Sequence, residues 1–186
     1  MAISKLVTAF ALVAYATANV LAQENKEQGT GTSTFSYAPG APDGFYVHAI
    51  NNAGYPENIF IGDLKDMLPP VANDTNTHTR RKEKQGDIYC KNQYTINYDD
   101  LVAAEQGLER MYQDGGSFSG KSTSYKYGSA VAYGCNYGNG QTITGSWLAA
   151  QYAAIGQKCG SNSPGWVAYP DWKSSYGVDQ SGVGFC

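Results

Sequence analysis

Residues 125–137 read Tyr-Lys-Tyr-Gly-Ser-Ala-Val-Ala-Tyr-Gly-Cys-Asn-Tyr, and this stretch decides the fold class. Larger and smaller side chains alternate along it. One expected face carries Tyr125, Tyr127, Val131, Tyr133, Cys135 and Tyr137, and the other carries Ala130, Ala132, Gly134 and Asn136. Alternation with a period of two is typical of a β-strand. Because the second face is made of small residues, we expect a helix or another backbone to approach it closely.

An amphipathic helix is predicted on each side of this stretch. The first spans about residues 99–113, with Asn97 or Asp99 as its amino-terminal cap. The second spans about residues 146–158, with Thr144 or Ser146 as its amino-terminal cap, and ends at Gly160. Their apolar stripes at helical spacing are Leu101, Ala104, Leu108 and Met111 in the first helix, and Leu148, Tyr152, Ile155 and Cys159 in the second.

Shorter apolar runs bounded by turn residues predict further strands at 44–50, 58–61, 165–169 and 183–186. After residue 88 the elements alternate between strands and the two helices. This order predicts an α+β fold, in which an antiparallel sheet carries two helices packed on one face and is stapled by disulfides. The expected organisation is a signal peptide at 1–22, a flexible N-terminal segment at 23–43, a β-hairpin at 44–64, a polar linker with a dibasic site at 65–87 and the disulfide-stabilised α+β domain at 88–186.

The first residues of the chain are typical of a secretory signal peptide. Lys5 precedes the apolar run 6–16, and small residues follow, with Ala16-Thr17-Ala18 and Val20-Leu21-Ala22 as alternative cleavage signals. The apolar run is shorter than the roughly 20 residues that a membrane-spanning helix needs. We therefore expect a secreted, extracellular protein without a membrane anchor.

Four cysteines, an even number, predict two disulfides in an oxidising compartment. Three connectivities are open. We expect Cys135 to pair with Cys159, which would pin a helix to the sheet, and Cys90 to pair with Cys186, which would join the ends of the domain. The spacing contains no short Cys-x-x-Cys pair of the kind that binds zinc, so no metal and no cofactor are expected.

Residues 65–87 carry two candidate processing signals. Asn73-Asp74-Thr75 is an acceptor sequence for N-glycosylation, which indicates a surface segment of a secreted protein. Arg80-Arg81 is a candidate dibasic cleavage site, and a solvated charge run is the other interpretation. Cleavage there would leave all four cysteines in the remaining domain.

The charge balance argues against nucleic-acid binding, and the scarcity of catalytic residue types predicts a protein that is not an enzyme. With 13 basic and 16 acidic residues, the chain lacks the basic footprint of a nucleic-acid-binding protein. The only two histidines are His48, in a predicted strand, and His78, in the linker, and no nucleophile-elbow motif is present.

Paired carboxylates are the remaining catalytic candidates, because two acids about 5–10 Å apart can hydrolyse a glycosidic bond. Asp99-Asp100 is explained by its position at a helix start, and we expect Glu105 and Glu109 to face water. Asp171 and Asp179, in a segment rich in aromatic residues, are the pair that we retain.

Aromatic residues near the C-terminus suggest a binding surface instead. Trp166 is expected in the core, whereas Tyr169, Trp172 and Tyr176 lie in a segment rich in glycine, proline and serine. Aromatic side chains on a loop can stack on sugars or fill a pocket of a partner protein. We therefore predict Tyr169, Trp172 and Tyr176 as partner-binding residues.

Several motifs together resemble a widespread family of small secreted fungal proteins. These motifs are Gly86-Asp87-Ile88-Tyr89-Cys90, Tyr98-Asp99-Asp100-Leu101, residues 128–138, Lys158-Cys159-Gly160, Gly165-Trp166-Val167, Tyr176-Gly177 and Phe185-Cys186. More loosely, the chain resembles the group of killer toxins from smut fungi and necrosis-inducing effectors. That resemblance implies an antiparallel sheet with two helices on one face, and a role as an effector, an elicitor of plant defence or a toxin.

The expected function is that of a secreted, monomeric fungal effector or elicitor. It would act on a host plant or a competitor by binding a protein or a cell-wall glycan, and not by catalysis. Two alternatives remain open. One is an antimicrobial or killer-type toxin, and the other is a cell-wall glycan-binding module or weak hydrolase.

Overall fold

The computed structural model describes residues 34–67 and 86–186, all within one compact unit, Ser33–Cys186. The predicted signal peptide, the Asn73 glycosylation site and the Arg80-Arg81 site lie outside the described residues. Within the described ranges, no helix is long and apolar enough to cross a membrane. The α+β prediction is confirmed.

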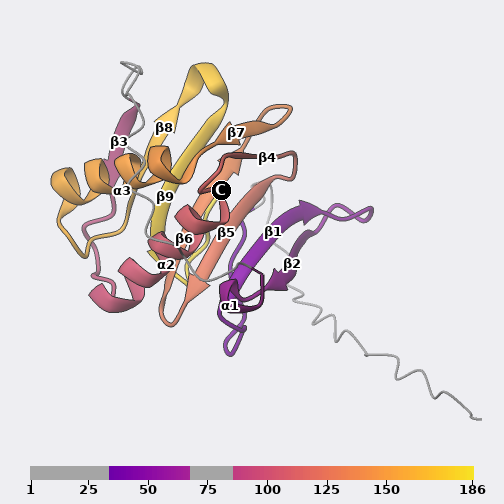
Figure 1. Ribbon diagram of the computed structural model, residues 1–186, viewed down its shortest axis with the longest axis horizontal. Helices are drawn as coiled ribbons and strands as arrows, with labels where there is room; N and C mark the ends of the chain where they lie inside the picture. Colours follow the sequence, from indigo (N-terminus) through magenta and orange to yellow (C-terminus); the bar gives the residue numbers. More distant parts are fainter. Residues whose placement is uncertain (1–33, 68–85) are drawn as a thin grey trace, which may run out of the picture. The chain divides into compact units, whose positions relative to one another are not determined.

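The core of the fold is an antiparallel sheet of seven strands in the order β2-β1-β5-β6-β9-β8-β3, with α2 and α3 against one face (Figure 1). A separate two-stranded sheet pairs β4 with β7. The strands are β1 Gly44–Ile50, β2 Pro56–Gly62, β3 Asp87–Cys90, β4 Gly116–Phe118, β5 Ser122–Tyr127, β6 Ala130–Asn136, β7 Gln141–Ile143, β8 Gly165–Tyr169 and β9 Ser174–Gln180. The helices are α1 Leu64–Met67, α2 Tyr98–Met111, α3 Gly145–Cys159 and the short 3-10 helix η1 Pro170–Trp172.

The stretch that predicted the fold class forms the hairpin β5–β6 at the centre of the sheet. Its turn is at Gly128, whose φ of 51° favours glycine. Along β6 the small residues Ala130 and Ala132 face the helices, as expected, whereas Tyr133 faces the other side. The turn resets the alternation, so the prediction that Tyr125 shares a face with Tyr133 is wrong: Tyr125 packs in the helix-side core.

Both predicted helices form, and their local signals explain their ends. Asn97 caps α2 by accepting a hydrogen bond from the backbone N–H of Asp100 at 3.1 Å. Thr144 caps α3 by accepting one from the backbone N–H of Trp147 at 3.2 Å. Gly160 follows α3 with a φ of 109°, a conformation that side-chain-bearing residues rarely adopt. The predicted apolar stripes of both helices are buried, apart from Met111 and Cys159, which are partly buried.

The face of the sheet opposite the helices is covered by the two ends of the described chain. Phe35 and Phe185 form a β-bridge with two backbone hydrogen bonds of 2.8 Å. Phe35 is 1% exposed and Tyr37 is 6% exposed, and both belong to a second core with Tyr133. The prediction of a flexible segment at 23–43 is therefore wrong for residues 34–43, because these aromatic side chains anchor it.

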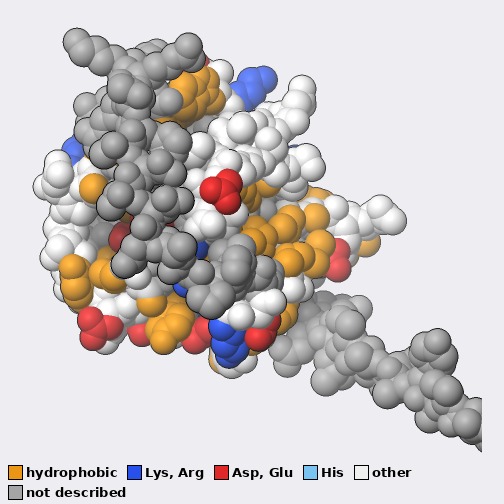
Figure 2. Space-filling model, viewed as in Figure 1, with side chains coloured by type: hydrophobic (Ala, Val, Ile, Leu, Met, Phe, Trp, Pro, Cys, Tyr) orange, Lys and Arg blue, Asp and Glu red, His pale blue; other side chains and the backbone are white. Residues whose placement is uncertain are grey.

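The predicted hairpin at 44–64 is confirmed as β1–β2, but it is not separate from the following domain. Strand β1 pairs with β5, which makes the hairpin one edge of the large sheet. The outer strand β2 leaves Ile59, Phe60 and Ile61 exposed, and Figure 2 shows hydrophobic side chains over this part of the molecule. The expected linker 65–87 is shorter at both ends, since α1 extends to Met67 and β3 begins at Asp87.

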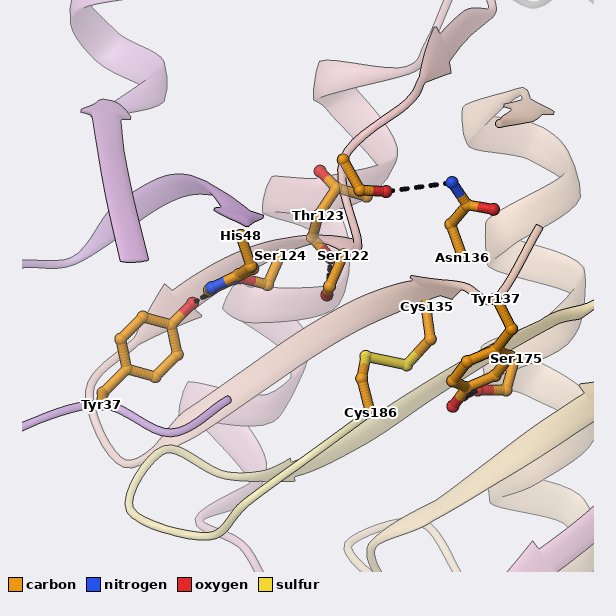
Figure 3. Close-up of a disulfide and its surroundings, with 11 residues drawn as sticks. Tyr37, His48, Ser122, Thr123, Ser124, Cys135, Asn136, Tyr137, Ser175 and Cys186 are labelled. Carbon is orange, nitrogen blue, oxygen red and sulfur yellow. Dashed lines mark hydrogen bonds between the residues drawn. A yellow bond between two sulfur atoms is a disulfide. The ribbon is translucent and has the colours of Figure 1, made fainter. Parts of the chain in front are cut away.

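The four cysteines form two disulfides as predicted, but in a different connectivity. Cys90 pairs with Cys159, and Cys135 pairs with Cys186, with Cα–Cα distances of 5.4 and 5.6 Å. Cys135 lies on the face of β6 turned away from the helices, so it cannot reach the end of α3. The first disulfide ties edge strand β3 to α3, and the second fixes the C-terminal tail over the opposite face (Figure 3).

Candidate functional site

The three predicted binding residues lie at one end of the β8–β9 pair. Tyr169 ends β8, Trp172 lies in η1, and Tyr176 is the third residue of β9. Pro170 begins η1 with a backbone angle suited to a helical turn. Lys173 then takes a left-handed conformation, with a φ of 52°, and the chain returns antiparallel as β9.

An aromatic cluster forms around Trp172. Its ring stacks on Tyr169, with centroids 4.6 Å apart and an interplanar angle of 11°. Trp147 from α3 closes the cluster, 5.5 Å from Tyr169 and 6.2 Å from Trp172. Tyr176 meets Trp147 edge-on at 4.7 Å. Geometries of this kind add to the stability gained by burial.

Only one of the three predicted residues offers its ring to a partner. Trp172 is 44% exposed, whereas Tyr169 is 6% exposed and Tyr176 is 1% exposed. The prediction of Tyr169 and Tyr176 as surface contacts is therefore wrong, because both rings are buried and support Trp172. Sequence reasoning missed Trp147, whose place in the predicted helix indicated core packing but not proximity to Trp172.

Polar contacts hold the cluster in place. The hydroxyl of Tyr169 donates a hydrogen bond to Gln151 Oε1 at 2.5 Å, which joins β8 to α3. The side-chain amide of Gln141 donates to the backbone carbonyl of Trp172 at 2.8 Å, which fixes η1 against β7. Burial raises the pKa of Tyr176 to about 12, so its phenol stays protonated. The indole of Trp172 is thus presented on a rigid support.

Trp166 lies on the other side of the sheet and is only partly buried, so the prediction of a core residue is only partly correct. It stacks on the exposed Tyr89 of edge strand β3, with ring centroids 5.2 Å apart. The ammonium group of Lys91 lies 5.9 Å from the Trp166 ring. These three side chains form a second, smaller aromatic surface near the β3 edge.

The retained carboxylate pair, Asp171 and Asp179, does not form a catalytic site. Asp171 is in η1, before the start of β9 at Ser174, and Asp179 is near the far end of that strand. Because a strand rises about 3.3 Å per residue, Asp179 lies about 17 Å along β9 from Ser174, toward the end of the strand away from η1. Asp179 is fully buried, with an ion pair to Lys91 and a hydrogen bond from Tyr94.

The buried His48 takes part in a polar network that the sequence did not predict. Asn58 uses its amide N–H to donate to the carbonyl of Ser36, which leaves Asn58 Oδ1 to accept from His48 Nδ1 at 2.8 Å. The other ring nitrogen, Nε2, therefore accepts from Ser124 Oγ at 2.6 Å. Ser124 in turn accepts from the hydroxyl of Tyr37 (Figure 3).

Ser124, His48 and Asn58 have the chemical types of a nucleophile, a base and an orienting group. Ser124 and His48 are both 0% exposed, however, and the ring of Tyr37 is buried beside them. Burial lowers the pKa of His48 to about 4, so the imidazole is neutral at physiological pH. In this arrangement the network attaches the N-terminal segment to the sheet and gives no access to a substrate.

Comparison with known proteins found no matching family model, curated protein or solved structure.

Trp172 and its supporting rings are thus the candidate site that the sequence predicted in part. The four cysteines, the other predicted site residues within the described ranges, form the disulfide framework. Among the described residues, no group of three or more acidic, histidine or cysteine side chains is arranged to hold a metal ion. The exposed ring of Trp172, stacked on Tyr169, offers aromatic stacking and apolar contact at the site.

Proposed function

We propose that the chain is a secreted fungal effector or elicitor that binds a host-plant or competitor target through the surface around Trp172, without catalysing a reaction. The observation that carries this proposal is the indole of Trp172, 44% exposed and stacked on the buried Tyr169. Rigid aromatic side chains lose little conformational entropy on binding, and tryptophan is enriched among residues that dominate binding energies.

Two further features support an extracellular role. Disulfides persist in oxidising compartments, and the structure has two of them in a domain of modest size. The predicted signal peptide at 1–22 and the resemblance to small secreted fungal proteins agree with this location.

The test is leaf infiltration with the purified, oxidised protein and a matched pair of variants. Trp172→Ala removes the exposed indole, and Tyr55→Ala removes a more exposed aromatic ring, 64% exposed, from the β1–β2 hairpin. A reduced and alkylated sample tests whether the folded state is needed. We expect a defence or necrosis response to the wild type and to Tyr55→Ala, and none to Trp172→Ala or to the alkylated sample.

A response to Trp172→Ala equal to that of the wild type would show that the target does not contact this surface. No response to the oxidised wild type would remove the elicitor proposal. Because Trp172 is close to half exposed, its replacement should leave the fold intact, which far-ultraviolet circular dichroism checks directly.

The same indole favours one second candidate, a glycan-binding protein of the fungal or plant cell wall. An exposed tryptophan face backed by a parallel ring is a surface on which a sugar ring can stack. Retention on insoluble chitin or β-glucan that is lost in Trp172→Ala and kept in Tyr55→Ala would support it. Equal retention of both variants would exclude this surface as the glycan site.

A further inference from the structure

A groove of about 420 Å³ runs between α2 and α3, apart from the Trp172 surface. The α2 side presents Tyr98, Val102, Glu105 and Glu109, which share one helical face by their spacing of three and four residues. The α3 side presents Ala149, Tyr152, Ala153 and Gly156 on one face in the same way. Small residues on α3 thus leave room opposite two carboxylates on α2.

Glu105 and Glu109 are less exposed than the sequence suggested. Both are partly buried in the groove, and no described residue forms a hydrogen bond or an ion pair with either of them. Burial raises the pKa of each to about 7, and the charge of Glu109 adds to the shift at Glu105. Two like charges one helical turn apart oppose each other, and a cation between them would relieve this repulsion.

Tyr152 supplies the second observation that points to a ligand. Its side chain is 3% exposed and lines the groove, and its hydroxyl has no hydrogen-bond partner among the described residues. Tyr152 lines the same groove as Glu105 and Glu109, and burial together with the charges of these two residues raises the pKa of its phenol. Buried polar atoms in native proteins are nearly always paired, so this hydroxyl lacks a partner that a ligand can provide.

We infer that the groove between α2 and α3 binds an organic cation, an ammonium or guanidinium group on an aliphatic stem, between Glu105, Glu109 and Tyr152. Such a group donates several N–H bonds, which suits two carboxylates and a phenol oxygen. Val102, Ala149 and Ala153 provide the apolar walls along which an aliphatic stem packs. The exposed ring of Tyr98 at the groove adds a surface for a cation–π contact.

A divalent metal fits this groove less well than an organic cation. Calcium takes six to eight oxygen ligands and magnesium takes six, and both favour carboxylates, of which the groove offers two. The rest of the lining combines the apolar side chains Val102, Ala149 and Ala153 with the neutral oxygens of Tyr98, Tyr152, Gln157 and Ser161. The ligand therefore carries its own hydrogen-bond donors and an apolar stem.

The two sources of such a cation are a lysine or arginine side chain of a partner polypeptide and a free polyamine. Calorimetric titration of the oxidised full chain distinguishes them. The probes are the peptide acetyl-Gly-Arg-Gly-amide, the same peptide with citrulline in place of arginine, and spermidine. Citrulline keeps the shape of arginine but removes its charge and replaces one nitrogen donor group by a carbonyl oxygen, so it tests whether binding needs the cationic head group.

We expect the arginine peptide or spermidine to bind with a dissociation constant below about 1 mM, and citrulline to show no binding at that concentration. Tighter binding of the peptide assigns the groove to a partner side chain, and tighter binding of spermidine assigns it to a free polyamine. Glu105→Gln and Glu109→Gln should each weaken binding about tenfold, since each removes one charge-assisted contact.

Two more variants separate binding from folding. Tyr152→Phe keeps the ring and removes only the unpaired hydroxyl, and we expect binding about three- to tenfold weaker with an unfolding midpoint that is unchanged or higher. Glu57→Gln, on the exposed strand β2, is the matched control and should bind like the wild type. Three results would overturn the inference. The citrulline peptide binds as tightly as the arginine peptide, the Glu105→Gln and Glu109→Gln variants bind as tightly as the wild type, or neither cation binds. Displacement of the cation by equimolar Ca²⁺ would overturn it as well, in favour of a metal site.

Discussion

The stability of the fold should depend on pH through the buried imidazole of His48. Its pKa is lowered by burial to about 4, whereas a histidine in the unfolded chain has a pKa near 6.5. As the pH falls from 7 toward 4, the unfolded state binds a proton that the folded state excludes. The stability that this neutral imidazole allows is therefore fully present above pH 6.5 and is lost as the pH falls through 6.5 toward 4.

The size of the effect follows from the two pKa values. Between pH 7.5 and pH 4.5, the difference in proton binding by this one residue lowers the free energy of unfolding by about 2.5 kcal/mol. Glu105 and Glu109 act in the opposite direction, because their raised pKa values favour folding as the pH falls from 7 to 4.5. The pH dependence of the wild type's stability therefore combines the contributions of His48, Glu105 and Glu109.

A variant isolates the contribution of His48. His48→Gln keeps a side chain that can form hydrogen bonds and cannot titrate, so its stability should follow only the remaining groups. Urea unfolding of both proteins at four pH values from 7.5 to 4.5 gives the difference directly. We expect the wild type to be more stable at pH 7.5, and its advantage to shrink by about 2.5 kcal/mol at pH 4.5.

Proton NMR provides an independent measurement, because the chain has only two histidines, His48 and His78. Replacing His78 assigns the two ring signals. A His48 signal that titrates near 6.5, or a difference between wild type and variant that stays constant from pH 7.5 to 4.5, would refute the reasoning.

The remaining predictions concern packing and the disulfides. Gly107→Ala should destabilise the protein by about 1–3 kcal/mol in thermal unfolding, since a Cβ there would lie 2.2 Å from the Tyr125 ring. Gly156→Ala in α3 is its control, because a Cβ there meets nothing within 4 Å, and it should raise stability by up to about 1 kcal/mol. A loss of stability as large as that of Gly107→Ala would contradict the packing argument. Joint replacement of Cys135 and Cys186 by serine should cost about 4 kcal/mol in urea unfolding, from the entropy of closing a loop of 51 residues, and an unchanged midpoint would show that this disulfide does not stabilise the fold.

The features that the sequence predicted well depend on neighbouring residues. Asn97 and Thr144 cap their helices through residues three positions away, and Gly160 follows α3 as expected, whereas α2 ends at Met111 with Tyr112 as its C-cap. The small residues Ala130 and Ala132 correctly predicted the close approach of the helices to β6. Each of these signals lies within or next to one element, so the local residues were enough to predict it.

The features that the sequence did not predict depend on pairings across the chain. The alternation along β6 already turned Cys135 away from the small-residue face where the helices pack, yet its partner Cys186 became evident only with the path of the C-terminal tail. Phe35 lies in a stretch of small polar residues, and its burial depends on pairing with Phe185, 150 residues later in the chain. Trp147 meets Trp172 only because α3 crosses the end of β8 and β9.

The two faces of the sheet differ in how their polar groups are paired, and this difference separates structural residues from binding residues. On the face covered by the chain ends, the polar side chains form closed sets, with His48 between Asn58 and Ser124 and with Asp179 bonded to Lys91. Groups of this kind rigidify a fold and leave nothing for a ligand to satisfy. In the helix layer, the carboxylates and the phenol of the α2–α3 groove lack partners among the described residues. Because an unpaired buried polar group costs free energy, the groove is where an external donor gains most on binding.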